Sequence, residues 1–156
     1  MNRKPFGAGL VALALATTVV ACSSDDKKSD DCVRASDSEM DALFTKWNDA
    51  LVAGDASKVA ALYRPDAVLL PTLSQPIADT PAEITEYFVN LIKAKPVARM
   101  VESHKESYCN VAYNVGLWTI NANGADVQAR VTWVYNYQDG NWAIAHHHSS
   151  VDPTPA

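Results

Sequence analysis

Positive charge is scarce in this sequence. Its 156 residues include 13 Lys and Arg against 18 Asp and Glu, so the formal net charge at pH 7 is −5. Removal of residues 1–21 would take away Arg3 and Lys4 and change the charge to 11 − 18 = −7. Binding to nucleic acid needs a basic face that neutralises phosphates. The charge balance therefore argues against nucleic acid as a partner.

The sequence also lacks an apolar run long enough to span a bilayer comfortably. The apolar and small-residue stretch at 6–20 follows the basic Asn2-Arg3-Lys4, a pattern typical of a secretory signal. Val19-Val20-Ala21-Cys22 resembles a bacterial lipobox, in which Cys22 receives a diacylglycerol and becomes the mature N-terminus. The alternative is ordinary cleavage near residue 21 beside an incidental cysteine. Both versions predict a signal peptide at 1–21 and an exported protein. The lipobox interpretation adds a lipid anchor at Cys22 as the only attachment of the protein to a membrane. It places the protein in the periplasm or at the cell surface.

Cysteine is rare as well, with three residues in the chain. Residues 22–31 contain no apolar side chain after Cys22 and are interpreted as an acidic, solvated tether. If Cys22 carries lipid, Cys32 and Cys109 remain as a pair in an oxidising compartment, which favours a disulfide between them. This bridge would connect the start of the first helix to a central strand. If both stay reduced, Cys109 is expected to be a small buried apolar residue.

Helix and turn signals divide the rest of the chain into two halves. The capping boxes Ser36-x-x-Glu39 and Thr80-x-x-Glu83 indicate helix starts, whereas Asn123-Gly124 and Asp139-Gly140 indicate tight hairpins. In chain order, the sequence predicts a helix at 37–53, a short helix capped by Asp55 and ended by Arg64-Pro65-Asp66, a strand at 67–70, a helix from Pro81 to Lys95-Pro96, and strands at about 98–107, 109–121, 126–138 and 141–150.

Helices first and an antiparallel meander second are typical of an α+β fold, with the helices packed on one face of a curved sheet. We expect a single domain over 32–152, followed by a tail at 153–156. The strand at 109–121 is apolar on both sides, because Val111, Tyr113, Val115 and Leu117 alternate with Ala112, Trp118 and Ile120. A sheet covered on one face only should be polar on the other. The strand therefore predicts a second subunit and a homodimer formed through the sheet.

The most unusual stretch is His146-His147-His148-Ser149-Ser150, at the end of the last predicted strand. A two-residue turn at Asp139-Gly140 pairs Gln138 with Asn141 and, counting outward, places Trp133 opposite His146 and Val131 opposite His148. This register predicts a pocket floored by His146, His148 and Ser150 and walled by Val131, Trp133 and Tyr135. A β-bulge would present His147 and Ser149 instead. The plainer alternative is a strand end whose histidines bind solvent or neighbouring carbonyls.

These motifs resemble a known family. The chain over 32–152 is similar to the bacterial calcium/calmodulin-dependent kinase II association-domain-like proteins, which have the cone-shaped nuclear transport factor 2-like (SnoaL-like) fold. Within that large group, the C-terminal His-His-His-Ser-Ser is similar to the iota-class carbonic anhydrases. The matching segments are Trp47-Asn48, Ala53-Gly54-Asp55, Leu62-Tyr63-x-Pro65-Asp66-Ala67-Val68-Leu69-Leu70-Pro71-Thr72, Glu86-Tyr87-Phe88, Tyr108-Cys109-Asn110 and Trp142-x-Ile144.

The resemblance implies an enzyme, a carbonate dehydratase (lyase) that hydrates CO2 to bicarbonate, in a family with members that work without metal; no cofactor would be required. The residues matching that family's catalytic groups are Thr72, Tyr87, His148 and Ser150, with Trp133, Tyr135 and His146 in the substrate pocket. The reaction needs an apolar cavity, a base that takes a proton from water, and hydroxyl donors. Either His148 or His146 could relay the proton. Without the resemblance, Thr72 would be a loop hydroxyl bonded to backbone and Tyr87 a core aromatic. Trp118 departs from the expected Tyr or Phe and should change the pocket volume while leaving its polar groups untouched.

Three alternatives stay open at this point. His146 and His148 have a spacing that can bind zinc or manganese, although the sequence offers no evident third ligand, since His104 lies at the start of the meander. A cyclase-like or isomerase-like enzyme of the same fold would need a pocket carboxylate, whereas the acidic residues fall mainly in caps, turns and the tether. A non-catalytic, oligomerising ligand-binding lipoprotein would explain the apolar sheet but gives no reason for the His/Ser cluster.

Overall fold

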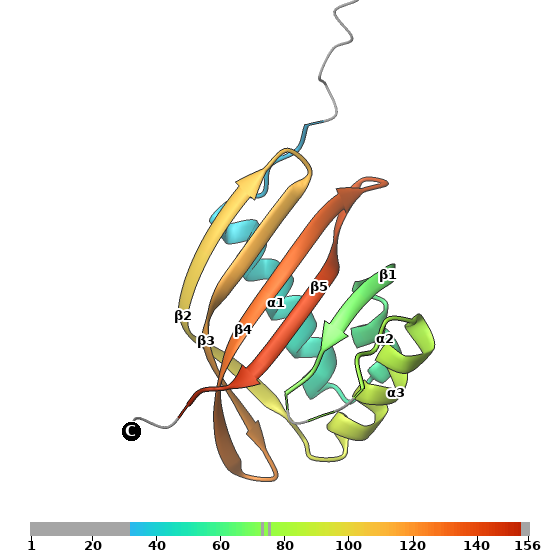
Figure 1. The fold of residues 1–156 in the computed structure, drawn as a ribbon, viewed down its shortest axis with the longest axis vertical. Coiled ribbons are helices and arrows are strands. Elements are labelled where there is room, and N and C mark those ends of the chain that lie inside the picture. The colour runs from blue at the N-terminus through green and yellow to red at the C-terminus, as the bar shows by residue number, and fades with distance from the viewer. Residues whose placement is uncertain (1–31, 73, 75, 154–156) are drawn as a thin grey trace, which may run out of the picture.

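The computed structural model describes residues 32–72, 74 and 76–153 (Figure 1). The predicted signal peptide, the lipidated Cys22 and the tether therefore lie outside the described residues, as do residues 154–156. No helix among the described residues is long and apolar enough to cross a membrane. The elements are α1 (Asp37–Val52), α2 (Ala56–Ala60), β1 (Tyr63–Leu70), α3 (Pro81–Ile92), β2 (Val97–Tyr108), β3 (Val111–Ala122), β4 (Ala125–Gln138) and β5 (Asn141–Val151).

Both predicted capping boxes are present. The Ser36 Oγ accepts a hydrogen bond from the Glu39 backbone N–H, and the Glu39 carboxylate accepts one from the Ser36 backbone N–H at 2.8 Å. Thr80 and Glu83 make the same reciprocal pair ahead of Pro81, which occupies the first turn of α3. These local bonds satisfy N–H groups that a helix cannot pair internally, and they explain why the starts of α1 and α3 could be predicted.

The five strands form one sheet in the order β1-β5-β4-β3-β2, in which β1 runs parallel to β5 and the other neighbours are antiparallel. Asn123 and Gly124 have φ of 54° and 81°, and Asp139 and Gly140 have φ of 53° and 85°. Positive φ at both central residues is the requirement of the type I′ hairpin, so both predicted turns are confirmed. The predicted α+β fold, with helices packed on a curved sheet, is confirmed (Figure 1).

The boundary at Arg64-Pro65-Asp66 was predicted wrongly. These residues do not end a helix, because β1 already begins at Tyr63. The pairing of β1 with β5 is irregular between Tyr63 and Val68, so Pro65, which has no N–H to donate, falls where the ladder is interrupted on an edge strand. Proline is tolerated in a sheet only at such positions.

The predicted disulfide between Cys32 and Cys109 is present, although not at a central strand. Cys109 is exposed in the turn between β2 and β3, and β2 is an edge strand. Two hydrogen bonds between Val33 and Asn110, each 2.8 Å long, accompany the disulfide. The segment before α1 is therefore attached to the tip of the β2–β3 hairpin.

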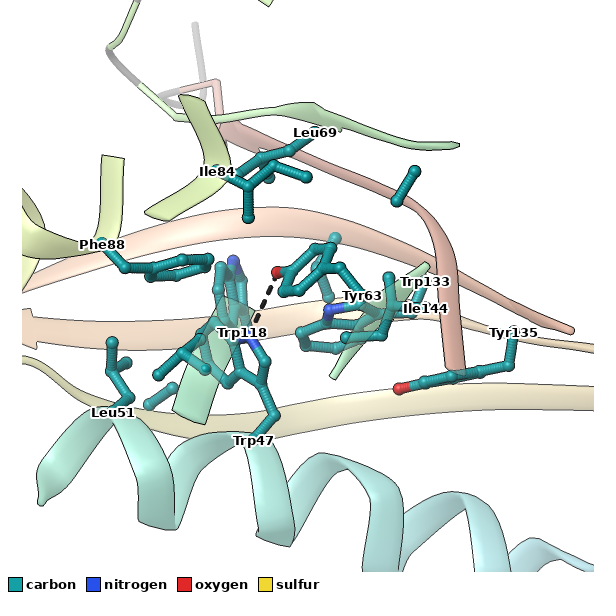
Figure 2. Packing of buried hydrophobic residues seen from close by; sticks show 14 of the residues in the cluster. Trp47, Leu51, Tyr63, Leu69, Ile84, Phe88, Trp118, Trp133, Tyr135 and Ile144 are labelled. Carbon is teal, nitrogen blue, oxygen red and sulfur yellow. Dashed lines mark hydrogen bonds between the residues drawn. The ribbon is translucent and has the colours of Figure 1, made fainter. Parts of the chain in front are cut away.

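Helix α1 crosses one face of the sheet, and aromatic side chains fill the space between them (Figures 1 and 2). The ring of Trp47 on α1 lies 5.8 Å from that of Trp118, 5.9 Å from that of Trp133 and 6.0 Å from that of Phe88. All four side chains are at most 3% exposed. The alternate side chains of β3, Val111, Tyr113, Val115 and Leu117, are only partly buried and project to the other face of the sheet. The described helices do not cover that outer face. Strand β3 therefore presents apolar side chains both to the core and to the uncovered face of the sheet.

Candidate functional site

A β-bulge in β5 decides which histidine and serine face the helices. Pairing follows the predicted register from the turn to Tyr135 opposite Ile144, but the next pair is Val134 with His146, so Ala145 is an extra residue. Beyond it, Trp133 pairs with His147 and Val131 pairs with Ser149. A single inserted residue transfers every following side chain to the opposite face.

The predicted placement of His146, His148 and Ser150 in the pocket is therefore wrong. Those side chains project to the outer face of the sheet, where His148 is exposed. His147 is 3% exposed and Ser149 6% exposed, and both face the core. The bulged alternative describes the structure.

His147 and Ser149 line a cavity of about 230 Å³ between the sheet, the end of β1 and helix α3. Thr72 and Tyr87 also line it, so the structure brings these two predicted residues together with His147 and Ser149. The remaining wall is mainly apolar and includes Trp47, Leu69, Leu91, Trp118, Ile120 and Val127. Among the described lining residues there is no Asp, Glu, Lys or Arg.

Trp133 and Tyr135, which were predicted as pocket walls, are buried but do not line this cavity. Trp133 instead supports the site from behind, because its ring packs 5.0 Å from the imidazole of His147. Tyr135 lies beyond the bulge, opposite Ile144. That pair is the one expected from the hairpin register, so the bulge leaves the position of Tyr135 unchanged.

Two hydroxyl groups meet at the cavity wall. Thr72 Oγ1, in the loop after β1, and Ser149 Oγ, on β5, are hydrogen bonded to each other. The alternative that the Thr72 hydroxyl bonds to backbone is therefore not observed. The indole N–H of Trp118 also donates to Ser149 Oγ, at 3.2 Å. Trp118 was expected to leave the polar groups untouched, and this bond corrects that expectation.

Tyr87 reaches the cavity from α3. Burial raises the pKa of its phenol to about 12, so the hydroxyl keeps its proton at neutral pH and can donate a hydrogen bond. Its ring also packs against Phe88, with centroids 5.0 Å apart. Tyr87 is therefore both a member of the aromatic packing and a polar group of the cavity wall.

His147 belongs to a buried chain of polar groups. The indole N–H of Trp47 donates to Tyr63 Oη at 3.1 Å, a bond drawn in Figure 2, and Tyr63 Oη is hydrogen bonded to His147 Nδ1 at 2.7 Å. Burial lowers the pKa of His147 to about 3, and the neighbouring His146 and His148 add to this effect. The imidazole is therefore neutral at physiological pH.

Sequence reasoning missed the roles of Trp47 and Tyr63. Helical spacing identified both as apolar core residues, and Tyr63 was assigned to the short second helix. The hydrogen bond from Trp47 to Tyr63 and the one between Tyr63 and His147 connect α1, β1 and β5 across 16 and 84 residues of sequence. No local pattern carries that information.

An open groove of about 440 Å³ adjoins the cavity and shares Thr72, Tyr87 and Leu91 with it. Glu83 and Glu86 on α3 line the groove. The groove thus presents acidic side chains beside the cavity, whose described lining residues are uncharged.

The metal-binding alternative depended on His146, His148 and a third ligand. His146 and His148 project to the outer face, and His104 on β2 bonds to Glu102 at 2.8 Å. Over residues 32–153 apart from 73 and 75, no group of three or more His, Cys, Asp or Glu side chains is arranged to hold a metal ion.

Comparisons with known proteins agree with this fold. The family described as calcium/calmodulin dependent protein kinase II association domain matches residues 36–153. A structure from Xanthomonas campestris assigned to the same association domains is 40% identical, covers 74% of this chain and 86% of that chain, and superposes with a TM-score of 0.71. No curated protein sequence matches significantly.

More distant structures share the fold alone. A protein from Streptomyces avermitilis, assigned as a dehydratase of the NTF2-like family, is 14% identical over 75% of this chain and 96% of its own, with a TM-score of 0.67. An NTF2-like protein of unknown function from Pseudomonas putida is 18% identical over 76% of this chain and 95% of its own, with a TM-score of 0.65. The chain therefore belongs to the calcium/calmodulin-dependent protein kinase II association domain family and has its NTF2-like, cystatin-like fold.

Proposed function

We propose that this domain hydrates CO2 to bicarbonate in the cavity lined by Thr72, Tyr87, His147 and Ser149. The observation that carries the proposal is the hydrogen-bonded pair of hydroxyls, Thr72 and Ser149, at the wall of a small apolar cavity. The resemblance of the His-His-His-Ser-Ser segment to the iota-class carbonic anhydrases supports the same reaction.

The lining of the cavity suits CO2 as a substrate. CO2 is small, apolar and uncharged, and mainly apolar walls around about 230 Å³ leave room for it together with a water molecule. Proton abstraction from carbon, the chemistry of a cyclase or isomerase, usually needs a carboxylate base. The described lining residues include none, which favours CO2 hydration over that alternative.

The proton follows a route different from the one expected from sequence. His146 and His148 lie on the outer face, and His147, with its pKa lowered to about 3 and its Nδ1 engaged by Tyr63, is a poor base at neutral pH. The hydroxyl pair remains. It can accept a proton at one oxygen while releasing one from the other, which is bifunctional acid–base catalysis without a charged residue.

The reaction then balances within the cavity. The water oxygen forms a bond to the carbon of CO2, and the displaced π electrons move to a CO2 oxygen. One water proton passes to the first hydroxyl of the Thr72–Ser149 pair, that hydroxyl's proton passes to the second, and the proton of the second passes to the CO2 oxygen. The product is carbonic acid, which ionises to bicarbonate in solvent. The hydrogen bond from Trp118 to Ser149 makes the serine hydroxyl a stronger donor, and the Tyr87 hydroxyl stabilises the developing oxygen charge.

A stopped-flow pH-indicator assay on the purified mature chain tests the proposal, with metal content measured on the same sample. Hydration that survives chelation supports the hydroxyl mechanism. Hydration restored only by zinc or manganese would replace it with metal catalysis. The absence of any rate above background in either condition would leave the non-catalytic binding module as the better description.

We further propose that the protein acts as an exported homodimer held to the membrane by lipid at Cys22. An exposed disulfide between Cys32 and Cys109 fits an oxidising compartment. The uncovered outer face, with Val115 and Leu117 near its centre, is the surface through which two copies would associate.

A further inference from the structure

We propose that Trp47 and Tyr63 hold His147 in the neutral tautomer that carries its proton on Nε2, so that His147 is a fixed hydrogen-bond donor to an oxygen atom of the molecule in the cavity. Trp47 and Tyr63 are then positioning residues. The identity of the molecule, CO2 or bicarbonate, rests on the proposed function, but the assignment of the tautomer does not.

The donor and acceptor in each hydrogen bond of the series Trp47–Tyr63–His147 follow from the chemistry of its first member. An indole N–H can only donate, so Tyr63 Oη accepts the bond from Trp47. Tyr63 is buried, and its other hydrogen bond among the described residues is the one to His147 Nδ1 at 2.7 Å. The hydroxyl proton of Tyr63 therefore has Nδ1 as its acceptor, because a buried O–H is rarely left without one.

An imidazole nitrogen that accepts a hydrogen bond carries no proton. A neutral ring has one proton, which must then lie on Nε2. The ring is enclosed by aromatic side chains, with the centroids of Trp47, Trp118 and Trp133 at 5.8, 5.9 and 5.0 Å. This apolar enclosure disfavours the imidazolium and keeps the ring neutral.

The other end of the ring lacks a partner. Nε2 is buried and makes no hydrogen bond to any described protein group, while the ring forms part of the cavity wall. The indole nitrogens around it are donors only and cannot accept its proton. A buried N–H without an acceptor is costly, so the acceptor is best supplied by the molecule that enters the cavity. Tyr87, which keeps its proton, lines the same cavity.

The ligand class follows from this set of groups. A neutral N–H and phenolic and aliphatic hydroxyls, with no charged side chain among the described lining residues, recognise an oxygen acceptor that is uncharged or carries a single negative charge. The carbonyl-type oxygens of CO2 and bicarbonate meet that description. Unlike a titrating histidine, a donor fixed in this way keeps its proton across the neutral pH range.

Nuclear magnetic resonance on the mature chain labelled with ¹⁵N-histidine tests the assignment. Long-range ¹H–¹⁵N correlations of the His147 ring should show an unprotonated, hydrogen-bonded Nδ1 and a protonated Nε2. Titration with bicarbonate should move the Nε2–H resonance of His147 and leave those of His104 unchanged. A protonated Nδ1 in the native chain would overturn the tautomer, and an Nε2–H resonance that bicarbonate leaves unmoved would overturn the donor role.

Tyr63→Phe removes the hydroxyl that accepts from Trp47 and donates to His147, and it keeps the aromatic ring. Tyr137→Phe, on β4 near the hairpin, is the matched control. We expect mixed tautomers of His147 in the first variant and the native tautomer in the second. If half of the rings switch, bicarbonate binding should weaken about two-fold, because affinity scales with the competent population. An unchanged tautomer in folded Tyr63→Phe would contradict the positioning role. If that variant fails to fold, the tautomer observed in the native chain still tests the proposal. A correct tautomer without CO2 hydration would refute only the proposed function.

Discussion

Replacing Ser149 with alanine, next to the same change at Ser150, separates the two possible registers of β5. Ser149→Ala removes the hydroxyl that is hydrogen bonded to Thr72 and accepts a hydrogen bond from the indole N–H of Trp118. Ser150→Ala removes a hydroxyl one residue further on, on the outer face. The two variants have the same composition, so any difference between them reports the side of the sheet on which each residue lies.

The expected loss of stability follows from the partners left behind. The Trp118 side chain is 3% exposed, so its indole N–H would lose its acceptor in a buried place, at a cost of about 1–3 kcal/mol. Thr72 is only half-buried and can turn its hydroxyl to water, so it adds little. Ser150→Ala should stay within about 0.5 kcal/mol of the native protein, as is usual for surface substitutions.

The expected loss of activity is larger. Without one member of the hydroxyl pair, the proton relay is broken, and acid–base catalysis of this kind typically contributes about 10²–10⁴-fold. CO2 hydration would be followed by stopped flow, and the free energy of unfolding by urea titration on the same samples. Equal activities of folded Ser149→Ala and native protein, or a greater loss in Ser150→Ala, would refute the assignment of the inward hydroxyl.

Four further outcomes are expected. Tyr87→Phe should lower kcat for hydration by about 10²–10³-fold while the urea midpoint changes little, since it removes one donor to the transition state and keeps the packed ring. Unaltered kinetics would exclude Tyr87 from the reaction. Burial depresses the pKa of His147 from its ordinary value near 6.5 to about 3, so the unfolded chain binds more protons than the folded chain between these pH values. The free energy of unfolding should therefore fall by about 1.4 kcal/mol for each unit by which the pH is lowered between 6.5 and about 3. A His147→Gln variant that unfolded with the same pH slope would disprove this. Cys32→Ser should lose about 2–4 kcal/mol of stability, and two free thiols found by non-reducing mass mapping of exported protein, at Cys32 and Cys109, would count against the bridge. The soluble form lacking residues 1–22 should scatter light as a dimer and its Leu117→Arg variant as a monomer. A native soluble form that is monomeric at micromolar concentration would remove the dimer proposal.

Much of the fold could be predicted from sequence because its signals are local. The capping boxes at the starts of α1 and α3 act over three residues, and the hairpins at Asn123-Gly124 and Asp139-Gly140 depend on residues that adopt positive φ. Thr72 and Tyr87 were identified as cavity residues through the family resemblance. Their own positions, in a loop and on a helix stripe, would not have distinguished them from structural residues.

The bulge at Ala145 could not be predicted. The register from the hairpin was right for the first pairs, and the cluster offered a histidine and a serine to either face, so the pattern itself contained no contradiction. The inner face was decided by contacts with residues far away in the chain. His147 meets Tyr63 across 84 residues, and Ser149 meets Thr72 across 77.

The sequence by itself determined the order and boundaries of most elements, the α+β class and the family, because each of these depends on short motifs or on residue composition. It favoured the pairing of Cys32 with Cys109, which the structure contains. Only the tertiary structure decided which imidazole is buried and which hydroxyls meet. That choice depends on one extra residue, Ala145, in β5. The free-energy cost of this bulge is offset by hydrogen bonds and ring contacts that α1 and β1 contribute to the interior. An alternating pattern has a period of two residues and is preserved when the strand slips by one, so the packing of the whole domain must select the face.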